Sequence, residues 1–296
     1  MGAEEIQRVG VVGCGLMGSG IAEVCARNGR SVTVVEVDAG ALARGRNRIE
    51  TSVKRAVSAG KLSEEEGLAT LERIELGTDI GALADRQLVV EAVVEAEPEK
   101  LRVFEALDKV VEAPDALLTS NTSSIPIMKL AMATERPEQV VGMHFFNPVP
   151  ILPLIEIVAS LLSSEEAVTR AEDFAVDALG KQAIRSKDRA GFIVNALLIP
   201  YLLSAIRMME SGFATPEDID TGMVRGCAHP MGPLALTDLI GLDTTMAVAN
   251  SLYQEFKEPL YAPPPLLARM VDAGLLGKKT GRGFYDYTGG EAKVPR

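Results

Sequence analysis

The feature that most restricts the fold of this chain is a glycine loop near its start, in the run RVGVVGCGLMGSGIAEVCARNG. An apolar stretch that ends at Val12 predicts a buried strand, and three glycines then lead into a helical stretch. Gly13 permits a tight turn, Gly15 lets a phosphate group approach the backbone, and Gly18 lets the helix pack closely on the strand. Because the N-terminus of a helix attracts anions, the pattern predicts a βαβ unit that binds a dinucleotide. A glycine-rich turn of another kind of α/β protein is the alternative.

The next strand-like run, SVTVVEVD, contains an acidic residue, Glu36, where the strand closes. A carboxylate at this position accepts hydrogen bonds from the ribose diol of an adenosine and repels a 2′-phosphate. The sequence therefore predicts NAD rather than NADP as the cofactor. Arg44 and Arg46 follow closely and argue in the opposite direction, because a cation would favour the additional phosphate.

Strand-like and helix-like segments alternate along the first part of the chain, up to about Ile184. This alternation predicts an α/β fold with a Rossmann-like, doubly wound parallel sheet and crossover helices. The strand-like runs are RVGVVG, SVTVVE, RIEL, QLVVEAV, ALLTSN, VVGMHFF, LPLIEIV and QAIRS. From Phe192 onward only helical stretches occur. We therefore expect a dinucleotide-binding domain over residues 1–187 and an all-helical domain over residues 188–296.

Two features of the helical part are informative. The run FIVNALLIPYLLSAIRMMESG is apolar on nearly every side, which predicts a helix that is deeply buried or lies in a subunit interface. Thr215, Pro216 and Asp218 predict the start of another helix, with a capping side chain, a proline in the first turn and an acid at the positive end.

One of the two histidines, His144, lies in the run GMHFFNPVP, ahead of Glu156 in the apolar stretch LPLIEIV. Alternation in a strand places Leu154, Glu156 and Val158 on one face, so a carboxylate lies among aliphatic neighbours. Burial of a bare carboxylate is costly unless a partner offers a proton or a positive charge, and an imidazole is a partner that titrates near neutral pH. The pair predicts a His–Glu dyad. The alternative is a histidine that packs at a strand end and a glutamate on an exposed edge.

Two further polar residues stand out against apolar surroundings. Ser123, in SNTSSIP, follows the fifth strand-like run at its carboxyl end, which is where a doubly wound sheet binds ligands. Asn195 starts the long apolar helix, where its amide needs hydrogen-bond partners. Each is either a ligand contact or a structural group, since hydroxyl-rich turns also cap helices.

A basic stretch, ALARGRNRIETSVKRAVSAGKL, follows the second strand-like run. It predicts either a solvated helix face, which is the usual meaning of such a run, or a contact for a phosphorylated substrate. Lys54 and Lys61 are the candidates for the second role.

Composition excludes several classes of function. A net charge of −11 and an aromatic content of 4% argue against nucleic-acid binding, because a phosphate backbone would be repelled. The 3 cysteines lack the spacing of a metal site, so we expect no metal, and their odd number suits a reducing compartment. No apolar run is long enough to span a membrane, and MGAEEIQ lacks the features of a targeting signal. We therefore expect a cytoplasmic protein with no membrane partner.

Taken together, the motifs VVGCGLMGSGIA, VVEAVVE, SNTSSIPI, GMHFFNPVP, DRAGFIVN, HPMGPLALTDLIGLD and KKTGRGFYDY cover essentially the whole chain. A chain with these motifs in this order resembles the L-3-hydroxyacyl-CoA dehydrogenases of the short monofunctional type, above all the bacterial enzymes of 3-hydroxybutyryl-CoA. A short insertion around SLLSSEE departs from the pattern away from the motifs, and we expect no hydratase domain.

The resemblance implies reversible oxidation of a 3-hydroxyacyl-CoA thioester to the 3-ketoacyl-CoA thioester with NAD, and a homodimer formed through the helical domain. It implies His144 as general acid and base, oriented by Glu156, with Ser123 and Asn195 holding the reacting oxygen. The implied catalytic residues are Ser123, His144, Glu156 and Asn195. The implied cofactor contacts are Gly13, Gly15, Leu16, Met17, Gly18, Glu36, Glu95, Lys100 and Asn121. The implied substrate contacts are Ser52, Lys54, Lys61, Ser123 and Asn195.

Three other functions remain open at this stage. The acyl group could be carried by a carrier protein rather than CoA, and sequence does not separate the two. The substrate could be a free 3-hydroxy acid, although such enzymes commonly have a catalytic lysine where this chain has Asn195 in FIVNALL. The chain could also bind NAD without catalysis, because the fold does not dictate activity.

Overall fold

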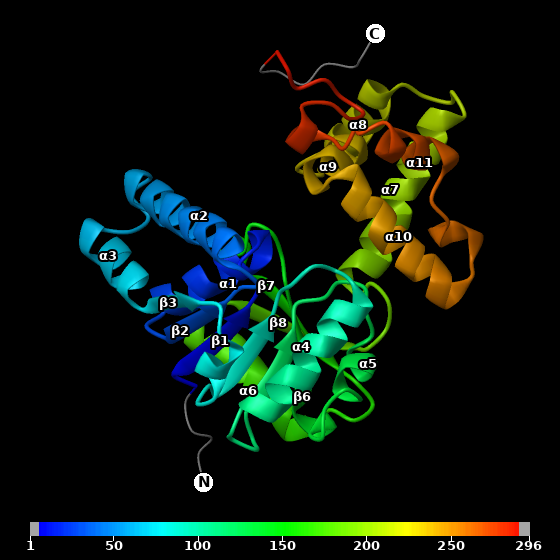
Figure 1. Cartoon of the computed structure of the whole chain (residues 1–296). Helices are drawn as coiled ribbons and strands as arrows, with labels where there is room; N and C mark the ends of the chain where they lie inside the picture. Colours follow the sequence, from blue (N-terminus) through cyan, green and yellow to red (C-terminus); the bar gives the residue numbers. More distant parts are fainter. Residues whose placement is uncertain (1–5, 290–296) are drawn as a thin grey trace. The chain divides into compact units, whose positions relative to one another are not determined.

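Eight strands form one sheet in the N-terminal part of the chain (Figure 1), and every strand-like run of the sequence corresponds to one of them. The computed structural model describes residues 6–289; residues 1–5, for which the sequence predicts no targeting signal, lie outside the described residues. The strands are β1 (Arg8–Val12), β2 (Ser31–Val35), β3 (Ile74–Gly77), β4 (Leu88–Glu91), β5 (Leu117–Ser120), β6 (Val140–Phe145), β7 (Leu154–Ala159) and β8 (Gln182–Lys187).

The strand order is β3-β2-β1-β4-β5-β6-β7-β8, and the direction of winding reverses between β1 and β4. The α/β class and the Rossmann-type winding are thus confirmed. Two strands depart from the expected parallel sheet, because β7 runs antiparallel to β6 and β8 runs parallel to β7. Only residues 146–153 connect β6 and β7, whereas a parallel pair needs a crossover of a dozen or more residues.

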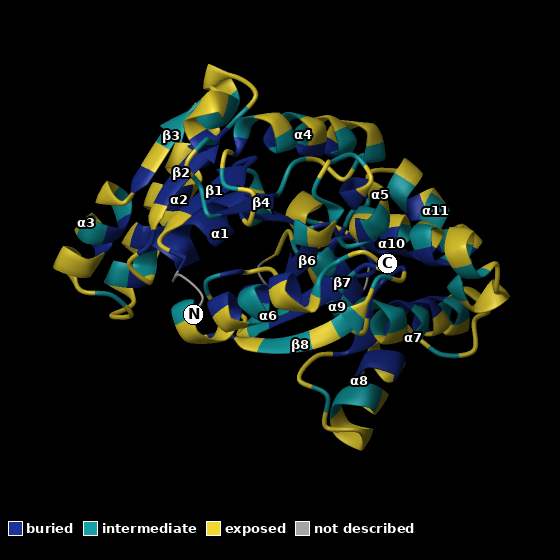
Figure 2. Cartoon of the chain, turned by 90° about the horizontal axis from the view of Figure 1, so that it is seen from below, coloured by how far each residue is buried: buried dark blue, intermediate teal, exposed yellow. Residues whose placement is uncertain are grey.

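Helices cover both faces of this sheet. They are α1 (Leu16–Arg27), α2 (Ala39–Ser58), α3 (Glu64–Glu72), α4 (Glu97–Val110), α5 (Ile127–Ala131) and α6 (Glu165–Asp173). Apolar side chains of α1, α2 and α6 pack with alternate residues of the strands in one core cluster. Consequently β1, β2, β4, β5 and β6 are buried on both sides, as parallel strands under two helical layers must be. Figure 2 shows the contrast with β8, an edge strand of mixed exposure.

The part of the chain from Ala190 onward forms a second compact unit, distinct from the first, which ends at Arg189. Its helices are α7 (Val194–Glu210), α8 (Pro216–Gly226), α9 (Pro233–Ile240), α10 (Leu242–Phe256) and α11 (Pro265–Asp272). The predicted helix start is confirmed, since α8 begins at Pro216 and Thr215 Oγ1 accepts a hydrogen bond of 3.2 Å from the backbone N–H of Asp218.

The long apolar helix α7 is buried along one side only within its own unit. Ile199, Leu203 and Ile206 belong to the core of the helical unit. On another side Leu197 is 72% exposed and Met208 is 41% exposed. These two residues are three helical turns apart and so lie on the same face, which remains apolar and uncovered in the single chain.

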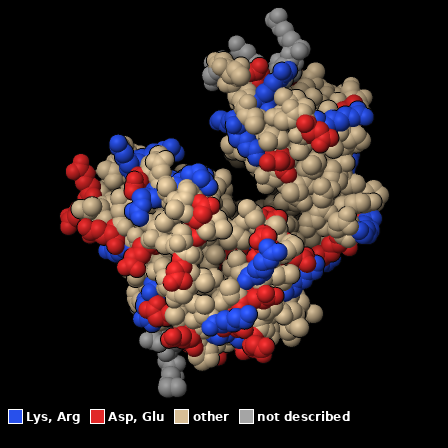
Figure 3. Space-filling view, viewed as in Figure 1, with Lys and Arg blue, Asp and Glu red and all other residues tan. Residues whose placement is uncertain are grey.

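Charged side chains are mixed over the face of the molecule shown in Figure 3, and acidic side chains gather over α3, whose first turn contains Glu64, Glu65 and Glu66. Among residues 6–289, no helix is both long enough and apolar enough to cross a membrane.

Candidate active site

The glycine loop lies between the end of β1 at Val12 and the start of α1 at Leu16. Gly13 has a φ of +92°, and a Cβ there would lie 2.7 Å from the carbonyl oxygen of Ala92. A Cβ at Gly18 would lie 1.9 Å from the carbonyl oxygen of Gly13. Both positions therefore require glycine, one for the turn and one for the contact between helix and strand.

The surroundings of the loop fit a dinucleotide pyrophosphate. Nothing lies within 4 Å of a Cβ built on Gly15, so the backbone there is open to a ligand. No side chain caps the N-terminus of α1, which leaves its first N–H groups directed at that space. Leu16, 64% exposed, and Met17 begin the helix beside it.

Glu36 follows β2 directly and its carboxylate lies against the glycine loop. Its Oε1 accepts a hydrogen bond of 2.6 Å from the backbone N–H of Cys14, and Oε2 accepts one of 3.0 Å from Val37. Of the arginines on α2, it is Arg48 that reaches this loop, with Nη1 3.5 Å from the carbonyl oxygen of Cys14. Arg46, named from the sequence, lies instead in a shallow pocket with Leu71, Ile74 and Leu76.

The cysteine inside the loop stays a thiol. Burial, and after it the negative charge of Glu36, raise the pKa of Cys14 to about 11, although Arg48 acts in the opposite direction. At neutral pH such a group is neither a nucleophile nor a metal ligand. Among residues 6–289, no three His, Cys, Asp or Glu side chains are grouped so as to hold a metal ion.

His144 and Glu156 form the predicted pair. They are direct partners in the antiparallel register of β6 and β7, and Nδ1 of His144 lies 2.7 Å from Oε2 of Glu156. Glu156 is fully buried and His144 is 6% exposed. Because a carboxylate can only accept, Nδ1 carries the hydrogen and Nε2 presents a lone pair. The arrangement can take up a proton at Nε2 and stabilise the resulting imidazolium through Glu156.

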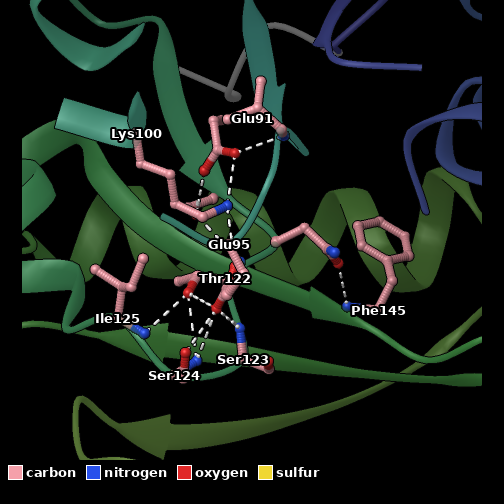
Figure 4. Close-up of polar contacts among 11 residues, drawn as sticks. Glu91, Glu95, Lys100, Thr122, Ser123, Ser124, Ile125 and Phe145 are labelled. Atoms are coloured by element: carbon pink, nitrogen blue, oxygen red, sulfur yellow. Dashed lines mark hydrogen bonds and ion pairs between the residues drawn. The ribbon is translucent and has the colours of Figure 1, made fainter. Parts of the chain in front are cut away.

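The turn after β5 carries Asn121 and Ser123 (Figure 4). The side-chain oxygen of Asn121 accepts a hydrogen bond of 2.9 Å from the backbone N–H of Phe145, next to His144, and so ties this turn to the end of β6. Ser123 donates its backbone N–H to Glu95 over 3.0 Å. Its hydroxyl makes no hydrogen bond to any residue between 6 and 289, which leaves it able to bind a ligand oxygen.

Glu91 belongs to the same edge and was missed by sequence reasoning. Its carboxylate is fully buried, 2.7 Å from the ammonium of Lys100, and accepts a hydrogen bond of 2.6 Å from Ser120 Oγ. The available signal was an acid inside the apolar run QLVVEAV, since a buried carboxylate requires a cation or several donors. Lys100 itself is 1% exposed.

The remaining named residues lie elsewhere. Ser52 lies on α2 and is half-buried. Lys54 on the same helix and Lys61 after it are exposed. Asn195 belongs to the other unit, where it is half-buried in the first turn of α7. The structure thus brings together His144, Glu156 and the turn of Asn121 and Ser123. The binding roles of Ser52, Lys54, Lys61, Glu95, Lys100 and Asn121 stay predictions.

A glycine loop for a dinucleotide and a histidine–carboxylate pair at the same edge of one sheet define a dinucleotide-dependent dehydrogenase. Comparison with known families agrees. The model of the 3-hydroxyacyl-CoA dehydrogenase NAD binding domain matches residues 8–189, and that of the family's C-terminal domain matches residues 191–287. The chain belongs to the 3-hydroxyacyl-CoA dehydrogenase family, which confirms the predicted family and its cofactor NAD.

Individual relatives extend over nearly the whole chain. A 3-hydroxybutyryl-CoA dehydrogenase of Mycobacterium tuberculosis is 60% identical over 285 residues, which are 96% of this chain and 100% of the relative. The crystal structure of M. tuberculosis FadB2 superposes with a TM-score of 0.95, at 60% identity, over 96% of this chain and 100% of that one. That of the (S)-3-hydroxybutyryl-CoA dehydrogenase PaaH1 of Ralstonia eutropha gives a TM-score of 0.90, at 42% identity, with the same coverage.

The glycine loop yields a matched pair of variants. Gly18→Ala forces a methyl group onto the Gly13 carbonyl, and we expect a loss of about 1–3 kcal/mol in the free energy of unfolding. Gly15→Ala meets no atom, so it should fold with unchanged stability and bind NADH more weakly. Thermal unfolding and NADH titration check the two effects. Equal stability of the two variants would contradict the packing role of Gly18.

Proposed function

We propose that this chain is an NAD-dependent dehydrogenase that interconverts (S)-3-hydroxyacyl-CoA and 3-ketoacyl-CoA thioesters, with 3-hydroxybutyryl-CoA and acetoacetyl-CoA as its substrate pair. The observation that carries the proposal is the buried hydrogen bond of 2.7 Å between His144 and Glu156 at the edge of the sheet where the glycine loop lies. The names of the relatives from M. tuberculosis and R. eutropha support the choice of substrate.

In the oxidative direction Nε2 of His144 accepts the proton of the substrate's C3 hydroxyl, while Glu156 holds Nδ1–H and stabilises the imidazolium. NAD, when bound, supplies the acceptor for the hydride that leaves C3. In the reductive direction His144 returns the proton to the C3 oxygen. The hydroxyl of Ser123 holds that oxygen and polarises it, and the family resemblance implies the same role for the amide of Asn195. A general base of this kind contributes about 10²–10⁴-fold to the rate.

The dyad is tested by NADH consumption with acetoacetyl-CoA. We expect rapid turnover in the wild type and a fall in kcat of at least about 10²-fold in His144→Ala, because the proton donor is lost. The dissociation constant of NADH should stay unchanged. Glu156→Gln should also lose activity and change the pH profile of kcat, since an amide cannot stabilise an imidazolium.

The other histidine gives the control. His229→Ala, in the helical unit, removes a ring that contacts Tyr201 and should leave kcat near the wild-type value. Turnover in His144→Ala equal to that of His229→Ala would refute the role of the dyad.

Glu36 is the residue that we expect to decide between NADH and NADPH. Glu36→Ser removes the negative charge that opposes a 2′-phosphate and leaves Arg48 nearby. The ratio of kcat/KM for NADH to kcat/KM for NADPH should fall at least about tenfold, which corresponds to 1.4 kcal/mol. Glu36→Gln keeps the shape of the side chain and so isolates the contribution of its charge to the preference for NADH. A wild-type enzyme that prefers NADPH would contradict the assignment.

We propose a homodimer formed through the helical unit. Its support is the apolar face of α7 that carries Leu197 and Met208, both exposed in the single chain. Light scattering should give twice the mass of one chain for the wild type and a lower mass for Leu197→Glu. Leu68→Glu, at a site 61% exposed on α3, is the matched control and should remain dimeric. A monomeric wild type would contradict the proposal.

We also propose a cytoplasmic location. Cys14, Cys25 and Cys227 are all free thiols, as expected in a reducing compartment, and the relatives named above are bacterial.

A further inference from the structure

One oxygen atom of Glu95 holds the whole turn that carries Ser123. Oε1 accepts hydrogen bonds from Thr122 Oγ1 at 2.5 Å, from the backbone N–H groups of Ser123 at 3.0 Å and Ser124 at 3.1 Å, and from Ser124 Oγ at 2.9 Å. Figure 4 shows these four bonds converging on one carboxylate from three consecutive residues.

The turn is fixed on its far side as well. Thr122 Oγ1 accepts a hydrogen bond of 2.9 Å from the backbone N–H of Ile125. Beyond it, the carboxylate of Asp188 accepts from the backbone N–H groups of Ile127 at 2.8 Å and Met128 at 2.7 Å. The backbone around Ser123 is thus held at both ends, while the Ser123 hydroxyl stays without a partner among residues 6–289.

The negative charge of Glu95 depends on Lys100. Burial is the largest influence and by itself raises the pKa of Glu95, but the Lys100 charge and the hydrogen bonds from the turn together bring that pKa below its usual value. Lys100 Nζ lies 3.2 Å from Glu95 Oε2. The fully buried Glu91, 2.7 Å from the same ammonium, keeps Lys100 in place.

The hydrogen bonds of Glu95 are concentrated on one of its two carboxylate oxygens. A carboxylate offers about four lone-pair positions, and here four hydrogen bonds reach Oε1 while Lys100 occupies Oε2. Oε1 therefore has no lone pair left for a donor of the cofactor, whose contact with this residue stays a prediction from the family resemblance.

We propose that Glu95 is a positioning residue that acts through Ser123: it sets the Ser123 hydroxyl against the C3 oxygen of the substrate. Lys100 and Glu91 maintain its charge. The inference rests on the proposed function, in which Ser123 touches that oxygen. Misplacement of a reacting group by about 1 Å can cost about 10²-fold in rate, so loss of the Glu95 bonds should affect kcat rather than cofactor binding.

A double-mutant cycle on kcat with acetoacetyl-CoA and NADH tests the coupling. We expect Glu95→Ala to lower kcat about 10- to 100-fold in the wild-type background. In Ser123→Ala the same change should lower kcat by less than about threefold, because no hydroxyl remains to be positioned. Glu95→Gln keeps one acceptor oxygen and should recover part of the loss. The dissociation constant of NADH should stay unchanged in all three.

The pH profile gives an independent measurement. The turn is held while Glu95 is ionised, and this hold is lost as the pH falls through the pKa of Glu95. In Lys100→Met, burial acts without the opposing charge and raises that pKa, so the acid limb of the reductive kcat should move to higher pH. His144 must be protonated in this direction, so it does not cause the acid limb. If Lys100→Met fails to fold, the double variant Glu91→Gln, Lys100→Met is measured in its place, because it removes both buried charges and leaves neither unpaired.

A matched control and a readout without turnover complete the test. Thr119→Val, on β5, removes a buried hydrogen bond of 3.0 Å to the carbonyl oxygen of Val89 on β4, outside this network, and should lower stability without altering kcat or its pH profile. Hydrogen exchange of the Ser123 and Ser124 amides should accelerate in Glu95→Ala and stay slow in Thr119→Val.

The possible failures are distinct. Additive effects of Glu95→Ala and Ser123→Ala, or weakened NADH binding that accounts for the loss, would overturn the positioning role and leave the proposed function standing. Absence of wild-type turnover would overturn the proposed function, whereas the exchange experiment would still report whether Glu95 holds the turn.

Discussion

The antiparallel pairing of β6 with β7 places His144 and Glu156 directly opposite each other, and the chemistry of the site depends on this register. Two residues that face each other across antiparallel strands have Cβ atoms about 5 Å apart, close enough for an imidazole and a carboxylate to meet. A register slip of one residue would turn Glu156 to the other face of the sheet. The hydrogen bond therefore comes from the rigid sheet rather than from a flexible loop, which suits a group that must keep one tautomer.

The parallel strands provide the rest of the site. The glycine loop follows β1, and the turn of Ser123 follows β5. Glu91 is the last residue of β4, and His144 lies near the end of β6. The carboxyl ends of these four strands lie at one edge of the sheet. The chain reverses its winding between β1 and β4, which opens the crevice where doubly wound sheets bind ligands. Anion recognition and proton transfer thus share an edge because the topology places them there.

Glu156 and Glu91 are both fully buried, and their negative charges are matched by different partners. Glu156 is matched to an imidazole that gains and loses a proton. Glu91 is matched to the ammonium of Lys100, 2.7 Å away. Breaking a buried pair typically costs about 3–5 kcal/mol because the remaining charge lacks a partner. The Glu91–Lys100 pair lies next to Glu95, which holds the turn of Ser123, whereas the Glu156–His144 pair is the one proposed to transfer a proton.

Much of this arrangement could be predicted from the sequence, because it is local. Alternation and apolar runs indicated all eight strands, the glycines indicated the turn and the close packing at Gly13 and Gly18, and Thr215 indicated the start of α8. The His144–Glu156 pair was also predictable, since a carboxylate in an apolar strand needs a titratable partner.

Tertiary structure alone decided the rest, because those contacts join residues that are distant in sequence. It reversed β7 and β8, placed Arg48 rather than Arg46 beside Cys14, and directed Glu95 to the Ser123 turn. It also buried Glu91 against Lys100. Sequence determined which side chains this protein has for binding a dinucleotide and moving a proton. The fold determined which of them meet, since hydrogen bonds act only over about 3 Å and the sheet sets those distances.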